Sequence, residues 1–387
     1  MRGKMFTAVT CAICAAGILM TGCGGGKKAD DTIKIGMIAE MTGNSASYGM
    51  SIAAGTRMAV EEINAGKGLL GKKIQLIEAD NKSEPAESAN AMSKLINQDK
   101  VPLVVGAFTS SCAIAAANVS DVVKIPFVSS GATNPVVTLT KDGKTKQYTF
   151  RVCFIDPFQG TVGANFVVND LKAKKAAIMI DNSSDYSKGL SKFFKESFTG
   201  KGGEIVSEEA YLQKDTDFKA VLTKIRATNP DVIFLPGYYE EVGKIIKQAR
   251  ELGITVPFVG GDGWDSPKLA EIAGAEALNN TYFTNHYSHE ATNPESVAFV
   301  AAYEKKFNAK PDALNVLGYD GLKLMADAVE RAGSIDGDKV AKALAETKGF
   351  KAVTGALDIN ETHDAIKSAV IIEFKDGKQT YRATVNP

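Results

Sequence analysis

Short apolar segments alternate with segments of helical spacing along most of the chain, and this alternation most constrains its fold. In the first series, strand-like segments at 32–40, 73–79, 101–107 and 125–129 enclose helix-like ones at 49–65, 83–97 and 110–123. In the second, strand-like segments at 176–180, 204–209, 232–235 and 257–260 enclose helix-like ones at 188–198, 218–226 and 241–252. Strands separated by helices of this length form parallel sheets covered on both faces. The sequence therefore predicts an α/β fold of two doubly wound parallel-sheet lobes.

The tail of the chain has a different pattern. Two strand-like segments, 370–374 and 379–384, flank Asp376 and Gly377, which are typical hairpin-turn residues. We therefore expect an antiparallel hairpin at the end of the chain.

The overall composition narrows the classes of partner. The 387 residues include 45 Lys and Arg against 45 Asp and Glu, and 44% are hydrophobic. Balanced charge argues against nucleic acid or an anionic membrane surface as the main partner, since both select basic proteins. With 3 His and 5 Cys, there is little material for a metal cluster or a disulfide scaffold. We expect neither a metal nor a cofactor.

The N-terminal segment is typical of an export signal. Arg2 and Lys4 precede an uncharged run at 5–20, which is shorter than the roughly 20 residues of a membrane-spanning helix. The residues Met20-Thr21-Gly22-Cys23 resemble the bacterial lipobox, in which the cysteine is lipidated. We expect a signal peptide at 1–22, a lipid on Cys23 and a polar tether at 23–31, so that the exported protein is anchored at the outer face of the cell membrane or in the periplasm. The alternative is a plain secretory signal, with Cys23 incidental.

Enzyme motifs are missing from the sequence. The stretch 66–73 approaches the phosphate-loop pattern, but Lys73 stands where a Ser or Thr should bind magnesium, and the stretch precedes a strand. His286 and His289 have no third metal ligand nearby, and no patterned base accompanies Ser110 as a nucleophile. We therefore expect no catalytic residues and favour a binding protein over an enzyme.

Small and polar residues follow the carboxyl ends of the predicted strands. Open parallel sheets bind ligands at that edge, and two facing lobes would enclose a small molecule. Ser110 precedes a helix, and the loop 131–135 brings small residues and the hydroxyl of Thr133. Hydroxyls and helix N-terminal amides suit a carboxylate. Each of these residues could instead be an ordinary helix cap, but their occurrence at adjacent strand ends favours a site.

The second series offers an acid at an equivalent place, and aromatic residues occur in loops of both series. Asp262, in a glycine-rich loop, could pair with an ammonium group or could be a turn aspartate. Tyr48, Tyr186 and Tyr238 could cover a ligand or could be packing residues. Together these groups suit a free amino acid, which carries a carboxylate and an ammonium on one carbon.

The ordered motifs resemble those of the branched-chain amino acid ABC transporter substrate-binding proteins, the leucine/isoleucine/valine-binding family with a type I periplasmic binding fold. The resemblance covers residues 32 to 381 and rests on IGMIAEMTGNSASYG, VVGAFTSS, PFVSSGATNP, IDNSSDYSKG, PGYYEEVGKIIKQARELG and VGGDGW. It implies that Ser110, Gly131 and Thr133 hold the ligand carboxylate. It implies that Asp262 and Thr133 hold the ammonium with help from Tyr238, and that Tyr48, Phe108 and Tyr186 shape the pocket.

The resemblance also implies the domain organisation and the role. The N-terminal lobe would comprise 32–151 and 285–355, and the C-terminal lobe 152–284 and 356–387, with three hinge crossings near 151–156, 283–287 and 354–357. The lobes would close on an amino acid, leucine, isoleucine or valine, and a monomer would deliver it to an ABC permease.

Several alternatives remain open at this point. The same fold could bind an amide, a urea or an aromatic acid, and a surface-anchored sensor or hydrolase could use the same cleft. Cys112 and Cys153 could form a disulfide or remain two buried thiols.

Overall fold

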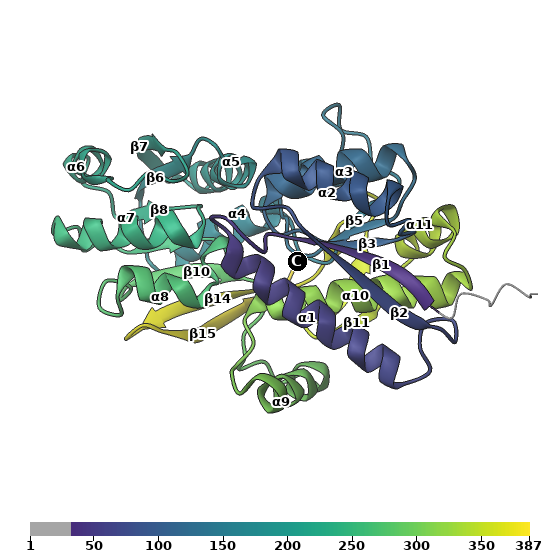
Figure 1. Cartoon of the computed structure of the whole chain (residues 1–387). Coiled ribbons are helices and arrows are strands. Elements are labelled where there is room, and N and C mark those ends of the chain that lie inside the picture. Colours follow the sequence, from purple (N-terminus) through teal and green to yellow (C-terminus); the bar gives the residue numbers. More distant parts are fainter. Residues whose placement is uncertain (1–31) are drawn as a thin grey trace, which may run out of the picture. The chain divides into compact units, whose positions relative to one another are not determined.

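The computed structural model describes residues 32–387. The predicted signal peptide, the tether and Cys23 lie outside these residues. Two large sheets and one small sheet organise the described part of the chain. Figure 1 shows how the helices surround them.

The first sheet is wholly parallel and has the order β2-β1-β3-β4-β5. Its strands are β1 (Thr32–Ala39), β2 (Lys73–Asp80), β3 (Val104–Gly106), β4 (Phe127–Ser129) and β5 (Thr149–Arg151). Its helices are α1 (Ala46–Ala65), α2 (Pro85–Asn97), α3 (Ser110–Val122), α10 (Ala313–Ala332) and α11 (Gly337–Ala345).

Neighbouring residues of these strands belong to different cores because side chains alternate across a sheet. Val104 and Phe127 pack with α2 and α3, whereas Val105 and Val128 pack with α1, α10 and α11. Helices therefore cover both faces, as the sequence predicts.

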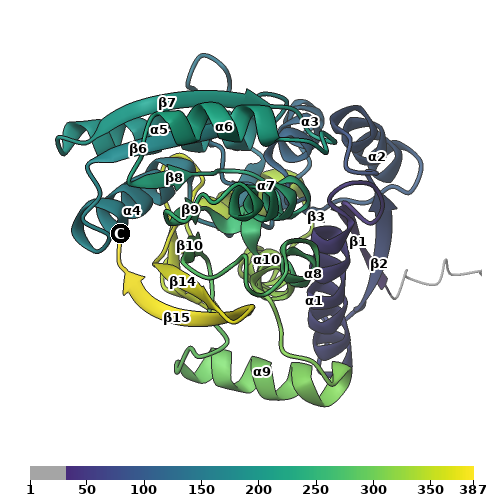
Figure 2. The same cartoon turned by 90° about the vertical axis from the view of Figure 1, so that its left-hand side faces the viewer.

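The second sheet has the order β15-β14-β10-β9-β8-β6-β7, with a parallel part from β10 to β7 and an antiparallel edge at β14 and β15. Its strands are β6 (Lys175–Asp181), β7 (Glu204–Tyr211), β8 (Val232–Phe234), β9 (Phe258–Gly260), β10 (Thr281–Asn285), β14 (Ala369–Lys375) and β15 (Lys378–Val385). Its helices are α4 (Asp156–Asn169), α5 (Asp185–Gly200), α6 (Lys219–Ala227), α7 (Tyr239–Glu251) and α8 (Pro267–Ala273). Figure 2 shows α4 and α7 on opposite sides of this sheet. The α/β prediction is confirmed.

The expected C-terminal hairpin is formed by β14 and β15. Its turn residues Asp376 and Gly377 have φ of 50° and 73°. Positive φ at both central residues matches the twist of the flanking strands, which explains the Asp-Gly pair.

The chain passes between the two large sheets three times, after β5, after β10 and before β14. The last passage differs from the expectation. The small sheet, β11 (Phe350–Ala352), β12 (Gly355–Ile359) and β13 (Ala365–Ile366), places Leu357, Ile359 and Ala365 in the core of the first sheet. The crossing expected near 354–357 therefore lies after Ile366, because these apolar residues are buried against α10 and α11. We therefore propose that residues 356–366 belong to the N-terminal lobe and not to the C-terminal lobe.

The remaining elements are the helix α9 (Pro294–Phe307) and the short 3-10 turns η1 (Pro135–Val137) and η2 (Asp262–Trp264). Within residues 32–387, no helix has both the length and the apolarity needed to span a membrane.

Candidate functional site

The residues predicted to bind a ligand converge between the two large sheets. None of their side chains is more than 4% exposed, and they comprise Tyr48, Phe108, Ser110, Thr133, Tyr186, Tyr238 and Asp262. Gly131 is also buried, and a Cβ at this position would lie 2.4 Å from the ring of Phe108. The loops after strands of both sheets therefore meet at one place.

Aromatic side chains from the helices and loops beside both sheets form the middle of this site. Tyr48, on α1, lies 4.4 Å from Phe108 and 5.7 Å from Tyr238, measured between ring centroids. Tyr186, on α5, stacks on Tyr238 at 5.2 Å. The hydroxyl of Tyr48 donates to the carbonyl of Gly263 and accepts from the amide of Tyr239 at 3.0 Å. One tyrosine side chain thus bonds the first-sheet side of the site to the second.

Further polar contacts connect the two sides around the rim. Ser111 Oγ donates to Asp185 Oδ2 at 3.0 Å, and Asn134 Nδ2 donates to the carbonyl of Asp185 at 2.7 Å. Asn44 Nδ2 donates to Glu241 Oε1 at 2.9 Å. The loops are in contact, so the structure is a closed arrangement of the two sheets.

A cavity of about 340 Å³ opens at this rim. Its lining comes from both sheets and includes Ser45, Glu84, Thr109, Ser111, Cys112, Ser183, Lys214 and Tyr238. Tyr238, which lines this cavity, also belongs to the aromatic group of the site.

One end of the site is rich in hydrogen-bond donors. The hydroxyl of Thr133 is buried and makes no hydrogen bond, and the amides of Ala132 and Thr133 donate to no described residue. Ser110 Oγ accepts from the amide of Asn134 at 3.3 Å, which leaves its own hydrogen free to donate. The N-terminus of α3 has no side-chain cap. Buried donors without partners are costly, so this end suits an anionic acceptor.

Glu40 holds the loop that carries Ser110. Its carboxylate accepts from the amides of Phe108 and Thr109 at 3.2 and 3.0 Å, and from the Thr109 hydroxyl at 2.8 Å. Burial raises the pKa of Glu40, and the bonds to this loop oppose the rise. The sequence analysis missed this residue, although an acid at a strand end was a usable signal.

The other end of the site carries acids. Asp262 Oδ1 accepts from Gln159 Nε2 at 2.8 Å, and Asp262 Oδ2 lies 3.0 Å from His286 Nε2. The ring of His286 stacks on Phe154 at 3.7 Å. Burial lowers the pKa of His286, so the imidazole is neutral at pH 7 and donates to Asp262. The sequence analysis did not place His286 in the site, but its side chain is buried beside Asp262.

Asp156 is a second buried acid in this region that the sequence analysis missed. Both of its carboxyl oxygens lack a hydrogen-bond partner. Burial raises its pKa to about 8; the nearby Thr133 hydroxyl opposes this shift without making a hydrogen bond, and the charge of Asp262 adds to it. Its backbone amide donates to the carbonyl of Thr133 at 2.9 Å. A buried carboxyl group without a partner beside Thr133 and Asp262 suits a cationic group of a ligand.

The two described cysteines lie next to the site. Cys112 lines the cavity at the rim, and Cys153 Sγ donates to the carbonyl of Ala132 at 3.4 Å. Cys112 and Cys153 are both free and buried, which settles the question that the sequence left open in favour of thiols. The described residues contain no cluster of His, Cys, Asp and Glu that could hold a metal ion.

Comparison with known proteins gives one consistent family. The sequence profile of the periplasmic binding protein family matches residues 32–379. The Leu/Ile/Val-binding protein BraC3 of Rhizobium johnstonii is 34% identical over 89% of this chain and 92% of its own length.

Two solved structures extend the comparison. A leucine-binding protein LivK of Thermotoga maritima is 39% identical, with a TM-score of 0.88 over 92% of this chain and 99% of its own. The branched-chain amino acid transporter substrate-binding protein LivJ of Streptococcus pneumoniae, in complex with isoleucine, is also 39% identical, with a TM-score of 0.86 over 92% of this chain and 100% of its own.

The match to the family profile, residues 32–379, spans nearly all of the described residues and every loop of the site. The interpretation as a binding protein instead of an enzyme agrees with this result. The chain belongs to the periplasmic binding protein family.

Proposed function

We propose that this protein is the extracytoplasmic substrate-binding protein of an ABC importer and that it binds a free branched-chain amino acid. The observation that carries the proposal is that one closed site holds both hydrogen-bond donors without partners and buried acids. Unpartnered donors at 132 and 133 lie in the same site as two buried acids, Asp156 and Asp262. A free amino acid presents the complementary charges on one carbon atom.

The carboxylate of the ligand is assigned to the first-sheet side. Ser110, Gly131 and Thr133 surround the buried donors there, and the N-terminus of α3 adds a favourable dipole. Glu40 fixes the backbone of 108 and 109 behind Ser110.

The ammonium is assigned to the second-sheet side, between Asp262 and Thr133, with Tyr238 nearby. Asp156 joins this set because its oxygens have no other partner. A carboxylate oxygen has two lone pairs, so Asp262 can accept from an ammonium in addition to Gln159 and His286.

The side chain of the ligand is assigned to the aromatic part of the site, formed by Tyr48, Phe108 and Tyr186. These rings offer apolar surface with few polar groups to desolvate, which suits an aliphatic side chain. The names of the relatives, which include leucine and isoleucine binders, support this choice.

Ligand binding drives closure because the ligand contacts both sides only when they meet. Opening would then release the amino acid to a permease in the membrane. Family membership implies export, and we propose the lipid on Cys23 as the anchor of a monomer.

Calorimetric titration of the mature protein with the common amino acids tests the proposal. We expect leucine, isoleucine or valine to bind most tightly, and binding to depend on Asp262. If no amino acid binds, the proposal is wrong. Binding of an amide, a urea or benzoate that survives Asp262→Ala would identify the alternative ligand class, and hydrolysis of a bound amide would identify an enzyme.

A further inference from the structure

Arg151 is a buried cation directly behind the loop assigned to the ligand carboxylate. It is the last residue of β5, and its side chain is 0% exposed. Its guanidinium donates from Nη1 to the carbonyls of Ala132 and Asn134 at 2.7 and 3.0 Å, and from Nη2 to the carbonyl of Pro135 at 3.4 Å and to Thr138 Oγ1 at 2.8 Å. The carbonyls of this loop therefore face the guanidinium.

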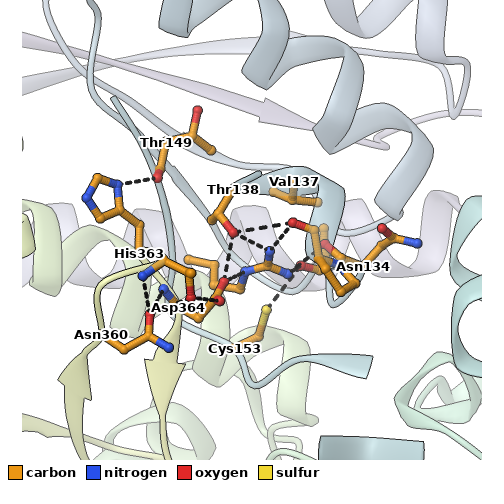
Figure 3. Close-up of polar contacts among 12 residues, drawn as sticks. Asn134, Val137, Thr138, Thr149, Cys153, Asn360, His363 and Asp364 are labelled. Carbon is orange, nitrogen blue, oxygen red and sulfur yellow. Dashed lines mark hydrogen bonds and ion pairs between the residues drawn. The ribbon is translucent and has the colours of Figure 1, made fainter. Parts of the chain in front are cut away.

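Asp364 holds Arg151 in this position from the far end of the chain. Its Oδ1 lies 2.7 Å from Arg151 Nε and accepts from Thr138 Oγ1 at 2.8 Å. Its Oδ2 accepts from Thr362 Oγ1 at 2.6 Å, and its amide donates to Asn360 Oδ1 at 2.9 Å. Figure 3 shows these contacts, with Asp364 and Asn360 on the segment between β12 and β13 and Thr138 on the loop.

Arg151 has no donor left for a ligand. A guanidinium carries five N–H groups. Here Nη1 and Nη2 donate to protein oxygens, and Nε makes no hydrogen bond but lies 2.7 Å from Asp364 Oδ1 as an ion pair inside the fold. Because Asp364 balances its charge inside the fold, Arg151 acts on the carboxylate of the ligand through the loop that it holds.

The planar peptide bond between Ala132 and Thr133 transmits this effect. In a trans peptide the carbonyl and the N–H point in opposite directions. Arg151 binds the Ala132 carbonyl, so the Thr133 amide points away from the guanidinium, and this amide has no partner among residues 32–387. The neighbouring thiol of Cys153 donates to the same carbonyl at 3.4 Å and reinforces the orientation.

We propose that Arg151, held by Asp364, is a positioning residue that aims the Thr133 amide at the carboxylate of the ligand. The identification of that carboxylate rests on the proposed function. The orientation of the loop does not depend on the identity of the ligand. The positioning role and the proposed function can therefore be tested separately.

Lys146 offers a matched control. It is also a buried cation, 3% exposed, and it donates to the carbonyls of Val136 and Val137 at 2.8 and 3.0 Å. It therefore supports the next few residues of the chain and not the peptide between Ala132 and Thr133.

The first measurement is hydrogen exchange in the ligand-free protein. Two variants remove the support, Arg151→Lys and the double variant Arg151→Met with Asp364→Asn, which avoids an unpaired buried carboxylate. We expect the amides of 131–134 to exchange at least about tenfold faster in both variants and to stay within about twofold of wild type in Lys146→Met. Unchanged exchange in both Arg151 variants would overturn the proposal.

The second measurement compares two probes, L-leucine and L-leucinol, which lacks the carboxylate. We expect the Arg151 variants to weaken leucine binding about tenfold or more, as for loss of one charge-assisted hydrogen bond, and leucinol binding less than about twofold. An equal loss for both probes would show a merely structural role and overturn the proposal. If wild type binds no amino acid but the exchange result holds, the proposed function is wrong and the positioning role stands.

Discussion

The hydroxyl of Tyr48 donates to the carbonyl of Gly263, and this bond ties α1 to the loop that carries Asp262. The same hydroxyl accepts from the amide of Tyr239 at the start of α7. Tyr48 therefore stabilises the closed arrangement of the two sheets and also lines the candidate site.

Replacing Tyr48 with Phe should weaken ligand binding by roughly 1–3 kcal/mol, mainly through faster dissociation, because the Tyr239 amide is left buried without an acceptor. Stopped-flow and calorimetry would measure the effect. Tyr381→Phe is the control, since that hydroxyl contacts only Thr384 at the surface. Equal affinities of wild type and Tyr48→Phe would contradict this role.

Replacing Asp262 with Asn should weaken amino acid binding by several kcal/mol, because an ammonium would be buried without its charged partner. The Asn amide can accept from Gln159 and donate to His286 Nε2 once the neutral imidazole carries its proton on Nδ1, so the fold should persist. Calorimetry with leucine measures the loss, and circular dichroism checks the fold. Asp142→Asn, an exposed acid, serves as control. An Asn variant that binds normally would remove Asp262 from the ammonium site.

Asp156 should make the stability of the ligand-free protein depend on pH. Its pKa is raised by burial to about 8 in the folded state, with Asp262 adding and Arg151 opposing, against about 3.9 in an unfolded chain. Its contribution is therefore fully present below pH 4 and is lost as the pH rises through 8. We expect the melting temperature of wild type to fall relative to Asp156→Asn over this range. Parallel curves for the two proteins would contradict the prediction.

Ligand binding should be coupled to the same group. An ammonium beside Asp156 favours the ionised carboxylate, so binding should release protons and tighten as the pH rises from about 6 to about 8. Titrations in buffers of different ionisation enthalpy measure the proton count. Asp156→Asn should abolish the release, and persistence of the release in that variant would assign it to another group.

Replacing Gly260 with Ala should destabilise the loop that carries Asp262. A Cβ there would lie 2.1 Å from Trp264 Cε2, and the buried indole is held by a hydrogen bond from Nε1 to the carbonyl of Leu235 at 3.0 Å. Overpacking of this kind costs about 1–3 kcal/mol. Gly200→Ala meets no atom within 4 Å and is the control for thermal unfolding. Equal melting temperatures would contradict the clash.

The sequence was sufficient to predict most strands of the two large sheets, but not β5, β10 or the small sheet. Strands between helices must end at one edge of a parallel sheet, so Ser110, Thr133 and Asp262 could be grouped before their contacts were known. Tyr48 was found because a tyrosine followed by glycine opens a helix beside that edge.

The residues that the sequence analysis did not identify are positioned by contacts between segments far apart in the chain. Asp156 lies beside a proline at a helix start and looks like a helix-boundary residue until the fold brings it to Thr133. His363 was not singled out from the sequence, yet its ring is buried and stacks on Phe150 at 4.0 Å. The helix α10 is buried along most of its length, so its apolar residues form no single stripe.

The contact between Arg151 and Asp364 also bears on when the protein becomes functional. Export delivers the chain from its N-terminus, so the segment around Thr133 emerges long before Asp364. Until that carboxylate arrives, a buried guanidinium would have no counter-charge, and the loop has no stable place in the fold. We therefore expect a newly exported chain to bind its ligand only after almost all of the chain has crossed the membrane.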